Sequence, residues 1–147
     1  MSKPTNDEPS PWPPPGIGPW VLASMTLWSA VLLVKLYPFS FDSAGSGGEG
    51  LLSLSPRSGT TVLWQIAMFV PLGFVEAQLA RRLLEGFSAA TLMLVMLDAG
   101  LLSLVGETVQ WWLPTRTSSV IDLAANMIGG VAGYLLCQHL NDWRNRG

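Results

Sequence analysis

Four long apolar segments constrain the fold of this chain more than any other feature of its sequence. Each approaches the roughly 20 residues that a helix needs to cross a hydrocarbon core about 30 Å thick. The segments are Trp20–Leu36, Val62–Ala80, Phe87–Gly106 and Val120–Gln138. Each of them holds a single charged side chain, and in chain order these are Lys35, Glu76, Asp98 and Asp122. We therefore predict an all-α, polytopic membrane protein with four transmembrane helices in a compact bundle that contacts the lipid bilayer.

The scarcity of charge supports this class and excludes several others. The chain has 8 Lys and Arg and 10 Asp and Glu among 147 residues, so only 12% of it is charged. A soluble domain typically carries about 25% charged residues, which it needs on its surface. The net charge of −2 provides no basic stripe to neutralise phosphates, which excludes a nucleic-acid partner. A single cysteine and a single histidine leave no Cys-rich or His-based site, so we expect no metal and no cofactor.

The sequence divides into three parts. Residues 1–19 contain seven of the eleven prolines and are predicted to be a disordered tail, because proline cannot continue a helix. Residues 20–138 form the transmembrane domain, and its connection at 38–61 holds five glycines and is expected to be irregular. Residues 139–147 are interpreted as a short cytoplasmic tail.

The placement of the basic residues predicts the orientation in the membrane. Cytoplasmic segments are enriched in Lys and Arg near the ends of the spans. With the N-terminus inside, the cytoplasmic side holds Lys3, Arg81, Arg82, Arg144 and Arg146, and the outer side holds Lys35, Arg57 and Arg116. Both termini are therefore expected in the cytoplasm.

With this orientation, polar residues gather at the outer ends of the spans. Glu107 and Gln110 are three residues apart and share one helix face. Asp122 and Asn126 are four apart, and Gly129 and Gly133 continue their stripe, where small residues let helices approach closely in lipid. Arg116 lies on the connecting loop and could bridge the two carboxylates. The predicted ligand-binding cluster comprises Gln65, Glu107, Gln110, Arg116, Asp122 and Asn126.

Several of these residues also have purely structural explanations. Ser119 and Asp122 match a helix N-cap followed by an acidic residue at the third helical position. Asn126 could simply form a hydrogen bond to a neighbouring helix. Pro114 is explained as a helix stop. Pro71 should kink or break its helix, and such kinks either border cavities or are packing features.

Two acids lie apart from the predicted cluster. Glu76 is explained by its closeness to the inner interface. Asp98 lies near the middle of its span, where a carboxylate costs about 2.5–3.5 kcal/mol on insertion scales. We expect Asp98 to be protonated or paired inside the bundle, and separate from Glu76, so that it makes a poor proton relay. Cys137 and His139, near the cytoplasmic end of the fourth span, are interpreted as structural.

Short blocks in a fixed order make the sequence resemble the VanZ-like family of small bacterial membrane proteins. The blocks are Tyr37-Pro38-Phe39, Phe69-Val70-Pro71-Leu72-Gly73-Phe74, Glu107-x-x-Gln110, Leu113-Pro114-x-Arg116 and Asp122-x-x-x-Asn126-x-x-Gly129. Family members commonly carry an asparagine where this chain has Gln65. The resemblance implies a multi-pass protein of the bacterial cytoplasmic membrane that acts at its outer face. It implies no reaction, and the antibiotic-resistance phenotype of one member does not transfer with the name.

Three functions are compatible with these features. The first is a non-catalytic membrane protein whose outward polar pocket binds an envelope ligand, such as a lipid-linked precursor or a glycopeptide-type antibiotic, or a membrane protein partner. The second is an intramembrane enzyme with Glu107 and Asp122 as an acid–base pair and Arg116 as an anion holder. The third is a small proton-coupled transporter with Asp98 as the proton site. We favour the binding protein, because no nucleophile–base pair is recognisable.

Overall fold

The computed structural model describes residues 16–37, 58–110 and 119–146 of the chain. Within these ranges the secondary structure consists of helices α1 (Gly18–Leu36), α2 (Gly59–Leu83), α3 (Ala89–Gln110) and α4 (Val120–Arg146), and it includes no strand. All four helices are long and apolar enough to cross a membrane. The prediction of an all-α protein with four transmembrane helices is thereby confirmed.

Two features of the helices differ from expectation. α4 continues to Arg146, eight residues beyond Gln138, so residues 139–146 belong to the helix. Its last turn carries Arg144 and Arg146, which complement the negative end of the helix dipole. α2 runs through Pro71 without interruption, so the helix is not broken there. The proline is exposed on the outside of the bundle.

Serine side chains begin three of the helices. The Oγ atoms of Ser58, Ser88 and Ser119 accept hydrogen bonds from backbone amides two or three residues ahead, at 3.2–3.3 Å. Such caps satisfy amide groups that have no partner inside the helix. The cap that the sequence predicted at Ser119 is therefore present in the structure.

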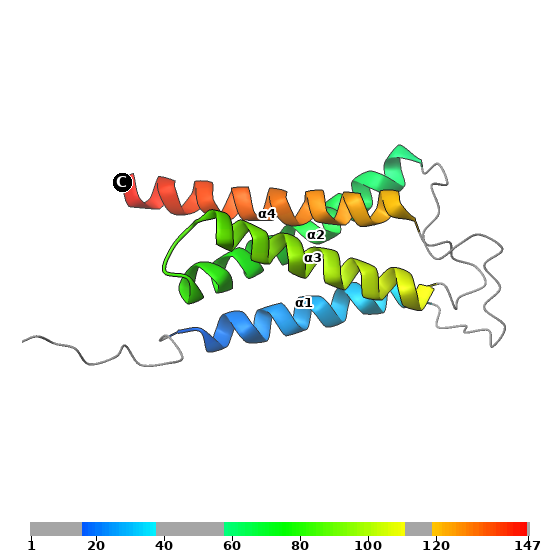
Figure 1. Ribbon diagram of the computed structural model, residues 1–147, viewed down its shortest axis with the longest axis horizontal. Helices are drawn as coiled ribbons and strands as arrows, with labels where there is room; N and C mark the ends of the chain where they lie inside the picture. The colour runs from blue at the N-terminus through cyan, green and yellow to red at the C-terminus, as the bar shows by residue number, and fades with distance from the viewer. Residues whose placement is uncertain (1–15, 38–57, 111–118, 147) are drawn as a thin grey trace, which may run out of the picture.

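The four helices lie side by side and alternate in direction (Figure 1). The start of α1, the turn between α2 and α3, and the end of α4 share one end of the bundle, which we call the Gly86 end. The end of α1, the start of α2, the end of α3 and the start of α4 share the opposite end, which we call the Ser119 end. The described residues of the predicted polar cluster therefore come from the half of the bundle nearer the Ser119 end.

The helices are unequally packed. α2 and α4 make the most extensive contact, whereas α1 packs on α2 and α3 and, over its described length, not on α4. One apolar core lies between α1, α2 and α3 and is formed by Val31, Phe69, Leu72, Ala99 and Leu102. A second lies closer to the Gly86 end and is formed by Ala77, Val95, Tyr134 and Cys137. Among the residues of α1, only Val31 and Lys35 are buried.

The outside of the bundle is strongly apolar. Large apolar side chains that are more than half exposed include Leu22, Leu33, Leu63, Met93, Leu97 and Leu135. Soluble monomers rarely expose apolar surface on this scale, so the natural surrounding for these side chains is lipid.

Candidate functional site

The polar residues of α3 and α4 lie buried between these two helices near the Ser119 end. Glu107 and Asn126 are 0% exposed and Asp122 is 4% exposed. Ser119 lies opposite Glu107, and Asn126 lies opposite Ser103, which is one turn before Glu107. Asp122 lies on the α4 turn between these two contacts. The structure therefore brings the predicted carboxylates and the Asn126 amide to one helix interface.

Glu107 is held by two donors from different helices. Lys35 Nζ of α1 lies 2.9 Å from Glu107 Oε1, and both side chains are almost fully buried, at 2% and 0% exposure. The backbone amide of Ser119 donates to Glu107 Oε2 at 3.0 Å. A carboxylate at the first turn of α4 also interacts favourably with the helix dipole. Glu107 therefore ties α1, α3 and the start of α4 together.

Lys35 was not among the predicted residues of the site. A lysine near the end of a span usually extends its ammonium group to the membrane surface, so its burial was not expected. Here its stem lies on α3, where a Cβ added at Gly106 would be 2.8 Å from Lys35 Cδ. Its ammonium group lies 5.9 Å from the centre of the Phe69 ring. The available signal was that Lys35 is the one charge in the first apolar segment.

Asn126 and Ser103 form the second buried contact between α3 and α4. Asn126 Nδ2 donates to Ser103 Oγ at 2.7 Å, and both side chains are 0% exposed. Asn126 Oδ1 has no hydrogen-bond partner among the described residues. Ser103 was missed in the sequence, although it lies four residues before Glu107 and so shares its helix face.

Gln65 is placed near this group by α2. It is partly buried and lies one turn closer to the Ser119 end than Phe69, whose ring faces the Lys35 ammonium group. Its Oε1 has no hydrogen-bond partner within the part of the chain that the structure describes. Two amide oxygens toward the Ser119 end, those of Gln65 and Asn126, thus lack a described donor.

The other predicted members cannot be placed in the same way. Gln110 closes α3, but its side chain is not described. Arg116 and Pro114 lie outside the described residues, as do Pro38 and Phe39. A bridge from Arg116 to the two carboxylates therefore stays a prediction.

The glycines of α4 allow it to approach α2 very closely. A Cβ added at Gly133 would lie 2.6 Å from the amide nitrogen of Phe74, and one added at Gly129 would lie 2.7 Å from Phe69 Cβ. Gly73 on α2 faces the backbone of Gly130 in the same way. The predicted close approach along small residues is confirmed. Gly129 and Gly133 face α2, however, whereas Asn126 faces Ser103 of α3.

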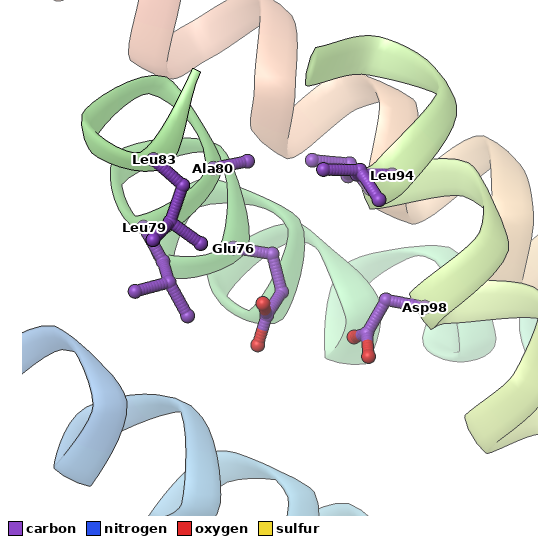
Figure 2. Close-up of a pocket in the computed structure, with 7 residues that line it drawn as sticks. Glu76, Leu79, Ala80, Leu83, Leu94 and Asp98 are labelled. Carbon is purple, nitrogen blue, oxygen red and sulfur yellow. The ribbon is translucent and has the colours of Figure 1, made fainter. Parts of the chain in front are cut away.

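Glu76 and Asp98 form a second polar group, which contradicts their expected separation. Ser24 Oγ of α1 donates to Glu76 Oε1, and Trp28 Nε1 of α1 donates to Asp98 Oδ2 at 3.1 Å. Both carboxylates line the same hollow, and they turn toward the same space beside α1 (Figure 2). The expectation that Asp98 is isolated was therefore wrong, because α2 and α3 bring the two acids to a similar depth.

Cys137 and His139 take part in none of the hydrogen bonds described for the two polar groups. Cys137 is a buried free cysteine, and His139 is exposed on α4. In the described ranges there is no group of three His, Cys, Asp or Glu side chains that could hold a metal ion.

The helices and their apolar exterior define a polytopic α-helical membrane protein with a buried polar interface. The VanZ/LLP1 family model matches residues 19–141. The match covers most of the chain, so this protein belongs to the VanZ/LLP1 family. No match was found among curated proteins or among solved structures.

Proposed function

We propose that this protein binds a polar ligand of the bacterial cell envelope at the buried interface near the Ser119 end. In the predicted orientation, this end faces outward from the cytoplasmic membrane and both termini face inward. The ligand classes that suit the interface are the headgroup of a lipid-linked cell-wall precursor and a glycopeptide-type antibiotic. Both are rich in hydroxyl and amide donors. A membrane protein partner is the alternative occupant.

The observation that carries this proposal is the Asn126 side chain. It is 0% exposed, and its Oδ1 has no hydrogen-bond partner among the described residues. A buried polar atom left without a partner costs about 1–3 kcal/mol, and such atoms are rare in native structures. Gln65 Oε1 presents a second acceptor of the same kind. A ligand that donates hydroxyl or amide hydrogens would satisfy both oxygens.

The contacts of Glu107 favour binding over catalysis. Its two carboxylate oxygens accept from Lys35 and from the Ser119 amide. A general base must instead reach a proton on its substrate. The same contacts position Asp122 and Asn126, because the Ser119 amide lies at the start of their helix. We therefore place Glu107 as a positioning residue and not as the base of an enzyme.

Native mass spectrometry of the purified protein tests this proposal. The wild type is expected to carry a co-purifying polar lipid or glycopeptide, whose fragments identify its class. Asn126→Ala should lose that adduct by about tenfold or more, since one hydrogen bond to a buried amide can be worth about 1.4 kcal/mol. Asn141→Ala is the matched control, because it removes the same group from α4 close to the opposite end.

The outcomes separate binding from a purely structural role. A wild-type protein that retains no ligand would contradict the proposal. So would an adduct that Asn126→Ala and Asn141→Ala retain equally. A thermal unfolding curve for each variant shows whether a lost adduct reflects the site or a lost fold.

A further inference from the structure

A stripe of donors on α1 meets the carboxylates of α2 and α3. Ser24, Trp28 and Lys35 recur at intervals of four and seven residues, which places them on one face of α1. Their partners are Glu76, Asp98 and Glu107, in that order. Each described acid inside the spans of α2 and α3 therefore receives a donor from α1.

The three carboxylates differ in how their charge is balanced. Glu107 is paired with the ammonium group of Lys35. Glu76 and Asp98 receive only neutral donors, a serine hydroxyl and an indole N–H. Neither acid has a cationic partner within ion-pair distance in the described part of the chain. A pair of acids at this depth normally faces a counter-charge or a polar cavity.

A hollow of about 470 Å³ lies directly beside these two acids. Its walls are largely apolar and include Met25, Trp28, Leu32 and Leu79. The carboxylates of Glu76 and Asp98 and the α1 serines Ser24 and Ser29 also line it. A smaller hollow of about 190 Å³ adjoins the same acids between α2 and α3. Mostly apolar cavities of about 300–1,000 Å³ with a few convergent polar groups are typical of small-molecule sites.

The position of the hollow makes it reachable from the lipid. None of the α1 residues that line the hollow is buried, although they run past the buried Val31. Glu76 lies seven residues before the end of α2, which is about 10 Å from that helix end at 1.5 Å per residue. A molecule in the membrane can therefore reach the acids from the side, between α1 and the rest of the bundle.

We propose that this hollow binds an amphiphile with one cationic amine and an apolar chain, which enters from the bilayer. The amine is placed between Glu76 and Asp98 and supplies the positive charge that Lys35 supplies to Glu107. The chain lies along the apolar walls formed by α1 and α2. This site is separate from the interface near the Ser119 end, and its occupancy does not depend on the function proposed there.

Photo-crosslinking in nanodiscs tests the proposal. The probe is dodecylamine with a diazirine in its chain, and the matched neutral probe is dodecanol with the same diazirine. Phosphatidylcholine nanodiscs contain no lipid with a primary amine to compete. The amine probe is expected to label the peptides of α1 and α2 that line the hollow about tenfold more than the alcohol, as for a newly formed ion pair. Unlabelled dodecylamine should suppress this labelling.

Charge-removal variants assign the effect to the two acids. Glu76→Gln with Asp98→Asn should reduce amine labelling of the hollow to the level of the alcohol. Glu85→Gln with Asp142→Asn removes the same charge from two exposed residues and should leave the labelling unchanged. Equal labelling of wild-type protein by both probes would overturn the proposal, and this comparison needs no variant. Labelling that persists in the Glu76 and Asp98 variant, or that falls equally in both double variants, would also overturn it.

Discussion

Gly133 offers a direct test of how closely α2 and α4 pack. A Cβ added there would lie 2.6 Å from the amide nitrogen of Phe74 and 2.8 Å from the carbonyl carbon of Gly73. Both are backbone atoms of α2, so they cannot rotate away as the end of a side chain can. Ordinary van der Waals contact begins at 3.4 Å. The carbonyl oxygen of Val70 would lie closer still, so Gly133→Ala requires the two helices to separate locally by more than about 0.8 Å.

The free energy of unfolding that this separation costs can be estimated. A gap of about 0.5–1 Å forfeits a quarter to a half of the dispersion energy of the atoms involved. Overpacking of a tight core typically costs about 1–3 kcal/mol, and we expect the upper end of that range because the opposing atoms are backbone. Alanine recovers about 0.8–1 kcal/mol of helix propensity over glycine. The expected net loss in free energy of unfolding is about 2 kcal/mol.

Gly100→Ala on α3 is the matched control. The nearest atom to a Cβ added at Gly100 is Met127 Sδ at 3.8 Å, which is an ordinary contact with a flexible side chain. This variant gains the helix propensity without the overlap, so its free energy of unfolding should equal or exceed that of the wild type. Reversible unfolding in mixed micelles, followed by circular dichroism during titration with SDS, measures both variants.

The comparison between the two alanine variants isolates the steric effect, because both add one methyl group to a glycine inside a helix. If Gly133→Ala is as stable as Gly100→Ala, the close approach of α4 to α2 at Gly133 does not hold. The assignment of the Gly129 and Gly133 face of α4 to α2 would then fail with it.

Two further predictions concern the polar interface and the orientation. Asn126→Ala and Ser103→Ala should each lower the free energy of unfolding. A double-mutant cycle should give a coupling energy of about 0.6 kcal/mol, as for other hydrogen bonds between membrane helices. A coupling energy of zero would show that the two side chains do not form this hydrogen bond. Reporter fusions are expected to place both termini in the cytoplasm and a reporter inserted between α3 and α4 outside, as the basic residues predict. A cytoplasmic signal from the inserted reporter would contradict this orientation. The interface near the Ser119 end would then lie on the inner side of the membrane.

Many features of the fold could be read from local sequence. The four spans follow from apolar runs of the right length, and the cap at Ser119 follows from its position before an acidic first turn. The close approach at Gly129 and Gly133 follows from the spacing of small residues on one helix. Each of these features depends on residues within one or two turns of each other, so neighbouring residues in the chain are sufficient to indicate it.

The pairing between helices could not be read in this way. Lys35 and Glu107 are 72 positions apart, and nothing local indicates that the lysine turns inward instead of toward the membrane surface. Trp28 and Asp98 are 70 positions apart, which is why the sequence did not indicate the partner of Asp98. Helical spacing shows which residues share a face, but not which neighbouring helix that face meets.

The sequence by itself therefore determined the class of protein, the number of spans and the residues whose charge or amide group needs an explanation inside a membrane. Only the tertiary structure decided how these residues combine. It paired Glu107 with Lys35, placed Glu76 beside Asp98, and turned Gly129 and Gly133 of α4 toward α2 while Asn126 faces α3. The physical reason is that these contacts depend on the rotation and neighbours of each helix, which packing of the whole bundle sets.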